Sequence, residues 1–298
     1  MTNGYAGPVL RWYASHARDL PWRLPGATAW SVLVSEIMLQ QTPVARVLPA
    51  HAAWLARWPT PPSLAAAAPG DAVRQWGRLG YPRRALWLHA TARILTDDHA
   101  GQVPASVQAL RGLPGVGSYT AAAVASFAFG QRHAVLDTNV RRVLARLVRG
   151  EEMPPRSASA AEVRLAEALL PAAPGRAARW SVAVMELGAL VCTAARPGCG
   201  GCPVARQCAW RRAGSPAGPA RPAAQRYLGS DRECRGRLLG VLREAAGPVA
   251  AARLEAAWPD RPQRARALGA LVADGLAAAL EQQMFALPGD PAVPQQTP

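Results

Sequence analysis

Lysine is absent from this chain of 298 residues, and all 34 of its basic side chains are arginines. A Schiff base requires a primary amine, which arginine does not provide. The N-terminal α-amino group is therefore the one primary amine that we expect in the chain. This absence excludes enzyme classes that act through the imine of a lysine side chain.

Acidic residues are also few, at 19, so the formal net charge is +15. A basic excess of this size indicates a polyanionic partner, in the first place nucleic acid, although charge alone names no partner. The chain has no apolar run long enough to span a bilayer and no secretory signal at its start. We therefore expect a cytoplasmic protein without a membrane partner.

Strand patterns are absent before residue 246, which predicts an all-α main domain. Caps and apolar periodicity place its helices near residues 29–40, 71–80, 118–129, 160–170 and 176–191. A stretch rich in proline, glycine, alanine and arginine at 213–226 is typical of a linker. Beyond it, three helices at 231–246, 251–258 and 263–275 and a short hairpin at 276–287 predict a winged-helix-like module. The expected domains are thus 1–212 and 227–290.

The segment from Leu113 to Asp137 organises the main domain. Gly115 and Gly117 form a tight turn before the Ala-rich helix, whose free N–H groups can receive a phosphate. An ordinary helix–helix connection would have the same glycines. Asp137 follows the apolar pair Val135-Leu136, and by itself it is best explained as an N-cap.

Glu36 interrupts an otherwise apolar helix among Val34, Ile37 and Met38. Apolar surroundings raise the pKa of a carboxyl group, which suits a general acid. A solvated or paired glutamate on the exposed face is the alternative. The helix ends at Gln40-Gln41, a polar corner, and Thr42 is expected to cap the next helix.

Four of the five cysteines, Cys192, Cys199, Cys202 and Cys208, have the spacing C-x6-C-x2-C-x5-C. In a protein without a secreted disulfide scaffold, such a cluster indicates metal. Zinc and an iron–sulfur cluster both accept four thiolates, and the residue types do not decide between them. Cys234 lies outside this spacing and is expected to be a buried free thiol.

The glycine turn, the Ala-rich helix and Val135-Leu-Asp-Thr-Asn-Val-Arg-Arg-Val together resemble the helix–hairpin–helix and Gly/Pro-Asp signature of a DNA glycosylase superfamily. Ser35-Glu-Ile-Met-Leu-Gln-Gln-Thr, Trp76-Gly-Arg-Leu-Gly-Tyr and Met185-Glu-Leu-Gly-Ala-Leu-Val-Cys resemble segments of its adenine DNA glycosylases, the MutY family. The likeness covers roughly residues 10–210. It implies an all-α, two-lobed glycosylase fold, and the cysteine spacing resembles that superfamily's 4Fe–4S loop at 192–208.

The resemblance also implies roles for individual residues. Glu36 is expected to protonate adenine at N7, Asp137 to stabilise the cationic sugar, and Tyr119 and Asn139 to orient these groups and the water. The implied DNA contacts are Gln41 and Tyr81 in the base stack, Gly115 and Gly117 on phosphate, and Trp22, Arg23 and Glu186 around the adenine.

By the same resemblance, the expected activity is hydrolysis of the N-glycosidic bond of adenine opposite 8-oxoguanine or guanine. The enzyme would act on double-stranded DNA in base excision repair, as a nucleoid-associated monomer. Tyr119 stands where bifunctional relatives carry their Schiff-base lysine, which implies a monofunctional enzyme. The alternatives are a thymine-mismatch glycosylase and a non-catalytic iron–sulfur DNA-binding protein.

The chain departs from the family pattern in three places. Pro82 follows Tyr81 where a second tyrosine is common, and one extra residue separates Trp22 from Glu36. The residues after the linker look unlike the Nudix-like domain that reads 8-oxoguanine in many members. Recognition of the oxidised guanine is therefore less directly implied than recognition of adenine.

Overall fold

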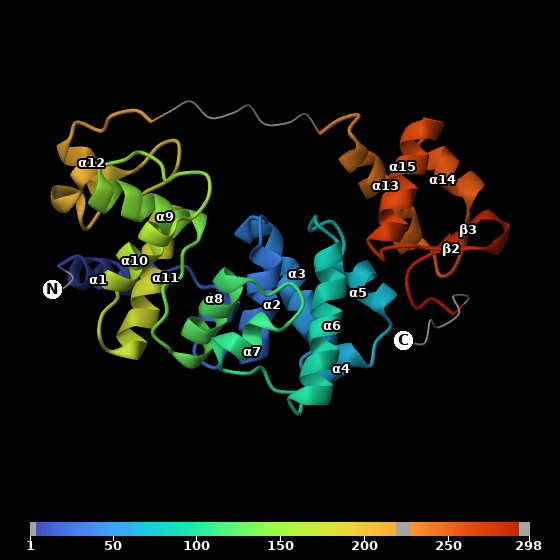
Figure 1. Ribbon diagram of the computed structural model, residues 1–298, viewed down its shortest axis with the longest axis horizontal. Helices are drawn as coiled ribbons and strands as arrows, with labels where there is room; N and C mark the ends of the chain where they lie inside the picture. The colour runs from blue at the N-terminus through green and yellow to red at the C-terminus, as the bar shows by residue number, and fades with distance from the viewer. Residues whose placement is uncertain (1–3, 219–226, 292–298) are drawn as a thin grey trace. The chain divides into compact units, whose positions relative to one another are not determined.

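The computed structural model describes residues 4–218 and 227–291. In this part of the chain, helices dominate and the strands are three short segments after residue 248, which confirms the expected all-α class (Figure 1). The described residues form two compact units, 4–36 with 104–112 and 116–218, and 37–103 with 113–115 and 227–291. Of the linker expected at 213–226, residues 219–226 lie outside the described residues.

The first unit is a helical assembly with its core between α1, α9 and α11. Trp12, Val184 and Leu187 are among the buried side chains of this core. Its elements are α1 (Ala6–His16), η1 (Pro21–Arg23), α2 (Ala29–Leu39, continuing into the second unit from Ile37), α7 (Val107–Arg111), α8 (Ser118–Phe129), α9 (Thr138–Leu144), η2 (Ala145–Arg149), α10 (Ala160–Ala168), α11 (Pro174–Leu190), η3 (Cys199–Gly201), η4 (Ala205–Gln207) and α12 (Ala209–Arg212).

Local signals account for the helix ends in this unit. Helix α8 begins directly after Gly117 and ends at Gly130, whose left-handed φ of 67° is the usual conformation after a helix C-terminus. Helix α10 begins with a capping box, in which Ser159 and Glu162 satisfy each other's backbone N–H groups. The expected range 118–129 is thus confirmed, and α10 ends two residues before the expected 170.

The second unit contains α3 (Val44–Arg57), α4 (Pro61–Ala65), α5 (Pro69–Trp76) and α6 (Arg83–Asp98). Three tryptophans make edge-to-face contacts in its interior: Trp54 lies 4.7 Å from Trp58 and 5.7 Å from Trp76 between ring centroids. Such pairs add to the free energy of burial through their ring quadrupoles. This aromatic core supports the segments on either side of α5.

The C-terminal residues of this unit form the winged-helix-like module, coloured orange to red in Figure 1. The antiparallel sheet has the order β1-β3-β2, and the hairpin expected within 276–287 is confirmed. Its elements are α13 (Asp231–Glu244), β1 (Val249–Ala250), α14 (Ala251–Ala257), α15 (Arg261–Ala273), β2 (Ala278–Leu280), η5 (Glu281–Gln283) and β3 (Met284–Ala286).

This module contacts α5 within the second unit. Asp290 is buried and accepts a hydrogen bond of 2.7 Å from Arg74, and Gly70 N–H donates to the Pro288 carbonyl. Arg243 of α13 donates to the Val73 carbonyl at 2.9 Å. The module is therefore anchored to the helix that leads into the Gly77–Tyr81 segment.

The expected limits of α5 and the expected cap of α3 are wrong. Helix α5 spans Pro69–Trp76 instead of 71–80, because Pro69 occupies the first helical position and Gly77 already has a φ of 54°. Thr42 does not cap α3, since Pro43 occupies the N-cap position and the Thr42 hydroxyl donates to the Leu79 carbonyl instead.

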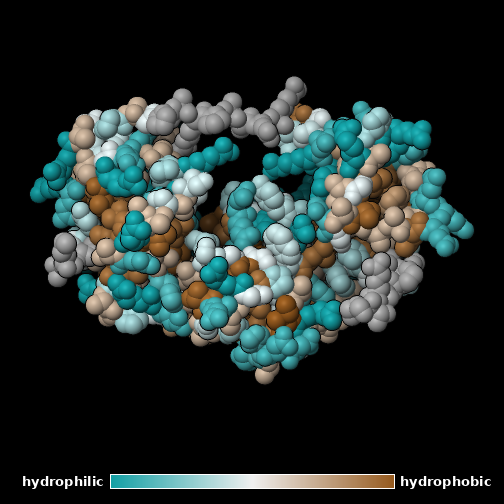
Figure 2. Space-filling model, viewed as in Figure 1, coloured by the Kyte–Doolittle hydropathy of each residue, from teal (hydrophilic) through white to brown (hydrophobic). Residues whose placement is uncertain are grey.

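In Figure 2, hydrophilic residues are interspersed among hydrophobic ones on the visible face. No described helix has the length and apolarity needed to cross a membrane.

Candidate active site

Glu36 lies on α2 next to the buried residues Ile37 and Met38, and 4 % of its surface is exposed. Burial raises the pKa of its carboxyl group to about 7, against the opposing effects of a Tyr119 hydrogen bond and the Arg23 charge. Oε2 has no hydrogen-bond partner among the described residues. The alternative of a solvated glutamate on an exposed face is therefore wrong. Near neutral pH, a substantial fraction of the Glu36 carboxyl groups is protonated, and Oε2 has no partner in the described residues.

Tyr119 lies in the first turn of α8 and hydrogen-bonds Glu36 through its hydroxyl. Burial and the nearby carboxyl groups of Glu36 and Asp137 raise the pKa of the Tyr119 phenol well above its ordinary value. The phenol therefore stays protonated and can act only as a hydrogen-bonding group. Tyr119 therefore lies close enough to both Glu36 and Asp137, within the first unit, for each carboxyl group to affect its pKa.

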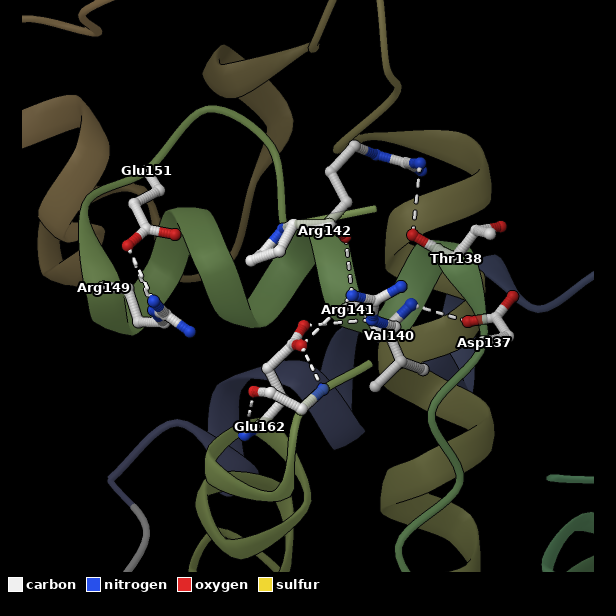
Figure 3. Close-up of polar contacts among 10 residues, drawn as sticks. Asp137, Thr138, Val140, Arg141, Arg142, Arg149, Glu151 and Glu162 are labelled. Atoms are coloured by element: carbon white, nitrogen blue, oxygen red, sulfur yellow. Dashed lines mark hydrogen bonds and ion pairs between the residues drawn. The ribbon is translucent and has the colours of Figure 1, made fainter. Parts of the chain in front are cut away.

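Asp137 is the N-cap of α9, as its sequence context predicts. Its Oδ1 accepts from Val140 N–H at 2.6 Å (Figure 3). Its Oδ2 accepts from Asn139 Nδ2 at 2.8 Å. Burial raises the pKa of Asp137 above its ordinary value, although these hydrogen bonds and Arg142 oppose the shift. The capping interpretation and a catalytic one are compatible, because one geometry holds the carboxylate in place for both.

Asn139 is supported from the opposite side by α11. A Cβ at Gly188 would lie 2.7 Å from the Asn139 Cβ, so only glycine allows this approach. Arg142 donates to Asn139 Oδ1 at 2.7 Å, to the Gly188 carbonyl at 2.7 Å and to the Cys192 carbonyl at 2.7 Å. Continuous hydrogen bonding thus runs from the Asp137 carboxylate to the start of the cysteine loop.

The same helix carries an ion pair that holds it against α10. Arg141 and Glu162 form a two-point pair with Nε–Oε1 at 3.0 Å, and both side chains are largely buried (Figure 3). A more exposed pair joins Arg149, at the end of η2, to Glu151 in the loop that follows. The Arg141–Glu162 pair fixes the orientation of α9 against α10 and therefore supports the position of the Asp137 cap.

Trp22, Arg23 and Glu186 are brought together, with Arg18 as an additional partner. Glu186 is fully buried and accepts from Arg18 Nε at 2.6 Å and from Arg23 Nη1 at 2.6 Å. Burial alone would raise the pKa of Glu186, but the bonds from Arg18 and Arg23 outweigh it and lower the pKa. Both of its oxygens are therefore engaged, and Glu186 holds Arg23 near Glu36.

Of the remaining expected DNA contacts, Gln41, Tyr81 and Gly115 lie in the second unit. Gly117 lies in the first unit and is the N-cap of α8, with an extended conformation. Gly115 has a φ of 75°, and a Cβ there would lie 2.9 Å from the Trp87 ring. Gln41 and Tyr81 have φ angles of 58° and 46°, in the left-handed region. This conformation costs a non-glycine residue about 1–3 kcal/mol and is concentrated at functional sites.

All four expected metal ligands line one pocket. Burial raises the pKa of the Cys202 thiol to about 11, so a cationic group is required to make it a thiolate at neutral pH. Arg146 is almost fully buried beside them and donates to Cys192 Sγ at 3.4 Å. Among the described residues, no three histidine, cysteine or acidic side chains are arranged to hold a single ion. Four thiols on the lining of one pocket suit a group that is held by four thiolates. Cys234 is buried elsewhere, as expected.

Sequence reasoning missed several arginines that support these sites. Arg18, Arg142 and Arg146 make their contacts to residues 46 to 168 positions away in the chain. No local pattern distinguishes them from the other arginines, except that Arg142 belongs to the motif that follows Asp137. The family segments could therefore have indicated Arg142 alone.

Comparison with known proteins agrees with this geometry. Residues 34–167 match the model of the HhH-GPD superfamily base excision DNA repair protein. The adenine DNA glycosylase of Mycolicibacterium smegmatis is 50% identical over 283 residues, covering 95% of each chain. That of Mycobacterium tuberculosis strain H37Rv is 51% identical over 287 residues, covering 95% of this chain and 93% of the relative.

The fold has a counterpart among solved structures. A thermostable thymine-DNA glycosylase superposes with a TM-score of 0.64 at 27% identity, over 70% of this chain and 95% of its own. The sequence relatives extend over nearly the whole chain, while this structural neighbour covers a smaller part. The chain therefore belongs to the adenine DNA glycosylase family and is a DNA glycosylase of base excision repair.

Proposed function

We propose that this protein is a monofunctional glycosylase that hydrolyses the N-glycosidic bond of adenine mispaired with 8-oxoguanine or guanine. The observation that carries the proposal is Glu36, a buried carboxyl group with a pKa of about 7 and an unpartnered Oε2. Its neighbours in the first unit are Tyr119 and Asp137. The names of the two mycobacterial relatives support adenine as the base.

In the proposed reaction, Glu36 is the general acid. Its protonated carboxyl donates to adenine N7, and the base then leaves with the electrons of the glycosidic bond. A purine offers N7 for this protonation, which favours adenine over thymine. The Tyr119 hydroxyl bonds to the carboxyl and holds its orientation, and the unpartnered Oε2 is free to face the base.

Asp137 is the proposed stabiliser of the cationic sugar, and Asn139 orients it. The logic parallels the two carboxylates of retaining glycosidases, where one is an acid and the other meets the anomeric carbon. Asp137 is held by Val140 and Asn139 before the substrate arrives, so little reorganisation is required. Water then completes the hydrolysis at the sugar and leaves an abasic strand.

Double-stranded DNA containing the mispair is the proposed partner. Gly115 and Gly117 are proposed to bind phosphate, and Gln41 and Tyr81 to enter the base stack while the adenine is extruded. Trp22 and Arg23 would line the pocket for the extruded base. Glu186 acts there through Arg23, because both of its oxygens are engaged by arginines.

A 4Fe–4S cluster is the proposed occupant of the pocket formed by the four cysteines. Its irons would bind the thiolates of Cys192, Cys199, Cys202 and Cys208 and tie the loop 192–208 together. Arg146 donates to the Thr193 and Ala194 carbonyls and stacks 4.7 Å from the Trp210 ring, which holds the loop in place. The loop would then present Arg196 to DNA phosphate.

We further propose the domain limits 1–212 for the glycosylase domain, 213–226 for the linker and 227–290 for the winged-helix-like module. Arg74 of α5 pairs with Asp290, and Arg243 of α13 donates to the Val73 carbonyl of α5. These contacts within one chain support a module that belongs to the same monomer. A substrate in chromosomal DNA is consistent with a cytoplasmic, nucleoid-associated enzyme.

A single-turnover assay on four duplexes tests the proposal. They hold adenine or thymine opposite guanine or 8-oxoguanine, and the protein is in excess. We expect release of adenine from both adenine duplexes and intact thymine duplexes. Release of thymine with intact adenine would replace this proposal with a thymine-mismatch glycosylase, for which the structural neighbour is the supporting observation.

A further inference from the structure

Arg84, in the first turn of α6, is a buried arginine surrounded by backbone oxygens of the second unit. Its side chain is 2 % exposed. Nη1 donates to the carbonyls of Ile37, Met38 and Gln40 at 2.8, 3.0 and 2.6 Å, and Nη2 donates to Thr42 Oγ1 and to the Gly80 carbonyl, both at 2.9 Å. One guanidinium thus closes the C-terminus of α2 and holds the turn before α6.

The Ile37 and Met38 carbonyls belong to the last turn of α2, and the other acceptors belong to two separate corners. The first is residues 40–42 and the second is residues 79–81, and each contains a non-glycine residue in the left-handed region, Gln41 and Tyr81. The Thr42 hydroxyl also joins the corners by donating to the Leu79 carbonyl at 3.2 Å. Arg46 adds a hydrogen bond to the Arg78 carbonyl. Unlike Thr42 and Arg46, Arg84 donates hydrogen bonds to the last turn of α2 and to both corners.

The charge and shape of Arg84 suit this position. Burial lowers the pKa of Arg84 to about 10, so the guanidinium remains charged at neutral pH. Its Cζ lies 5.2 Å from the Trp76 ring centroid and 5.4 Å from that of Tyr81. Nε also donates to the Tyr81 carbonyl at 3.4 Å, which makes six acceptors in all. A lysine ammonium has three donors and no planar face, so it cannot reproduce these six hydrogen bonds and the two ring contacts together.

We propose that Arg84 is a positioning residue that holds Gln41 and Tyr81 in one fixed geometry, so that both side chains enter the base stack together. The proposal rests on the proposed function in assigning these two residues to the stack. Arg84 is buried and would act through these two residues and not through its own contact with DNA or the reacting atoms. Its effect reaches the reaction through extrusion of the base, since a displacement of 1 Å far from the chemistry can slow a reaction about 100-fold.

The test compares Arg84→Lys and Arg84→Met with the wild type on two duplexes in single-turnover assays. In one, adenine lies opposite 8-oxoguanine and must be unpaired; in the other, it lies opposite an abasic-site analogue and has no partner. We expect the rate on the first duplex to fall about 10- to 100-fold and the rate on the second to fall less than about 3-fold. Arg243→Lys is the matched control, because Arg243 is half-buried and donates to a carbonyl in this unit but touches neither corner.

Equal losses on the two duplexes would overturn the proposal, and so would unchanged rates on both. Circular dichroism and thermal melting establish that the variants fold. If Arg84→Met does not fold, Arg84→Lys decides the outcome. If neither variant folds, Arg84 is a residue of the core alone and the proposal is wrong.

A binding measurement makes this test independent of the proposed base. A 2-aminopurine placed beside the mispair changes fluorescence when side chains enter the stack, whether or not a base is released. We expect the change with the wild type and Arg84→Lys to differ by at least about 3-fold at saturating protein. Identical changes would overturn the role of Arg84. Failure of the wild type to release adenine would instead overturn the proposed function.

Discussion

The hydroxyl of Tyr119 hydrogen-bonds the carboxyl group of Glu36, which is buried and has a pKa of about 7. The bond joins the first turn of α8 to α2, so the segment after the glycine turn and the segment of the acid meet in the first unit. Tyr119 can orient the carboxyl without competing for its proton, because the phenol pKa is raised well above its ordinary value.

Glu36→Gln should slow base release about 100-fold or more, because an amide cannot donate the proton. For the wild type, release requires protonated Glu36, and its pKa is about 7. The single-turnover rate should therefore fall as the pH rises through about 7. Glu233→Gln is the control, since Glu233 is buried and paired with Arg237 in α13, a helix that carries none of the expected site residues. A Glu36→Gln variant with the wild-type rate and pH profile would place the acid elsewhere.

Asp137→Asn should abolish base release while leaving mispair binding and the fold nearly unchanged. Asparagine keeps an oxygen for the Val140 N–H and is as good an N-cap as aspartate, but it lacks the charge that stabilises the sugar cation. Asp137→Ala should lose the cap as well, at a cost of about 1 kcal/mol in the free energy of unfolding. Chemical denaturation and gel-shift assays measure both effects. Turnover by Asp137→Asn near that of the wild type would contradict this role.

The raised pKa of Glu36 predicts a stability that depends on pH. The carboxyl has a pKa of about 7 when folded and an ordinary value of 4.5, so folding favours the protonated form. This contribution is fully present below about pH 4.5 and is lost as the pH rises through 7. Glu36→Gln should therefore be more stable than the wild type at pH 8 by up to about 3 kcal/mol, with no such gain at pH 4.5. If the stability difference between Glu36→Gln and the wild type were the same at pH 4.5 and pH 8, burial would not destabilise the charged form of Glu36.

The purified protein should be brown, with visible absorption and about four irons per chain. Iron and zinc analysis of anaerobically prepared protein measures this, and stoichiometric zinc without iron would refute it. Cys199→Ser should weaken binding to mispaired DNA more than it alters the helices between residues 30 and 130. The loop between Cys192 and Cys199 carries Arg196, which is then no longer held toward phosphate.

Base release should leave an intact abasic strand, because no lysine is present to form an imine. Borohydride should trap little or no protein–DNA adduct, and strand scission should require alkali or heat. The N-terminal amine is the control, and blocking it removes any slow reaction from that group. Efficient trapping with the N-terminus blocked would contradict the monofunctional assignment.

Sequence alone determined the features that depend on neighbouring residues. Glycines and caps set helix α8 at residues 118–129, Asp137 as an N-cap, and the hairpin near the C-terminus, because these signals act within a few residues. The cysteine spacing predicted a set of four ligands, and the family segments predicted Glu36 and Asp137 as catalytic residues.

Tertiary structure decided what depends on distant contacts. Glu36 is buried because elements from other parts of the chain cover α2, and the same burial raises its pKa. Arg18 meets Glu186 168 positions away, and Arg84 meets the Gln40 carbonyl 44 positions away. Arginines with such partners resemble every other arginine in the sequence, because the free energy of a buried guanidinium depends on acceptors that only the folded chain brings together.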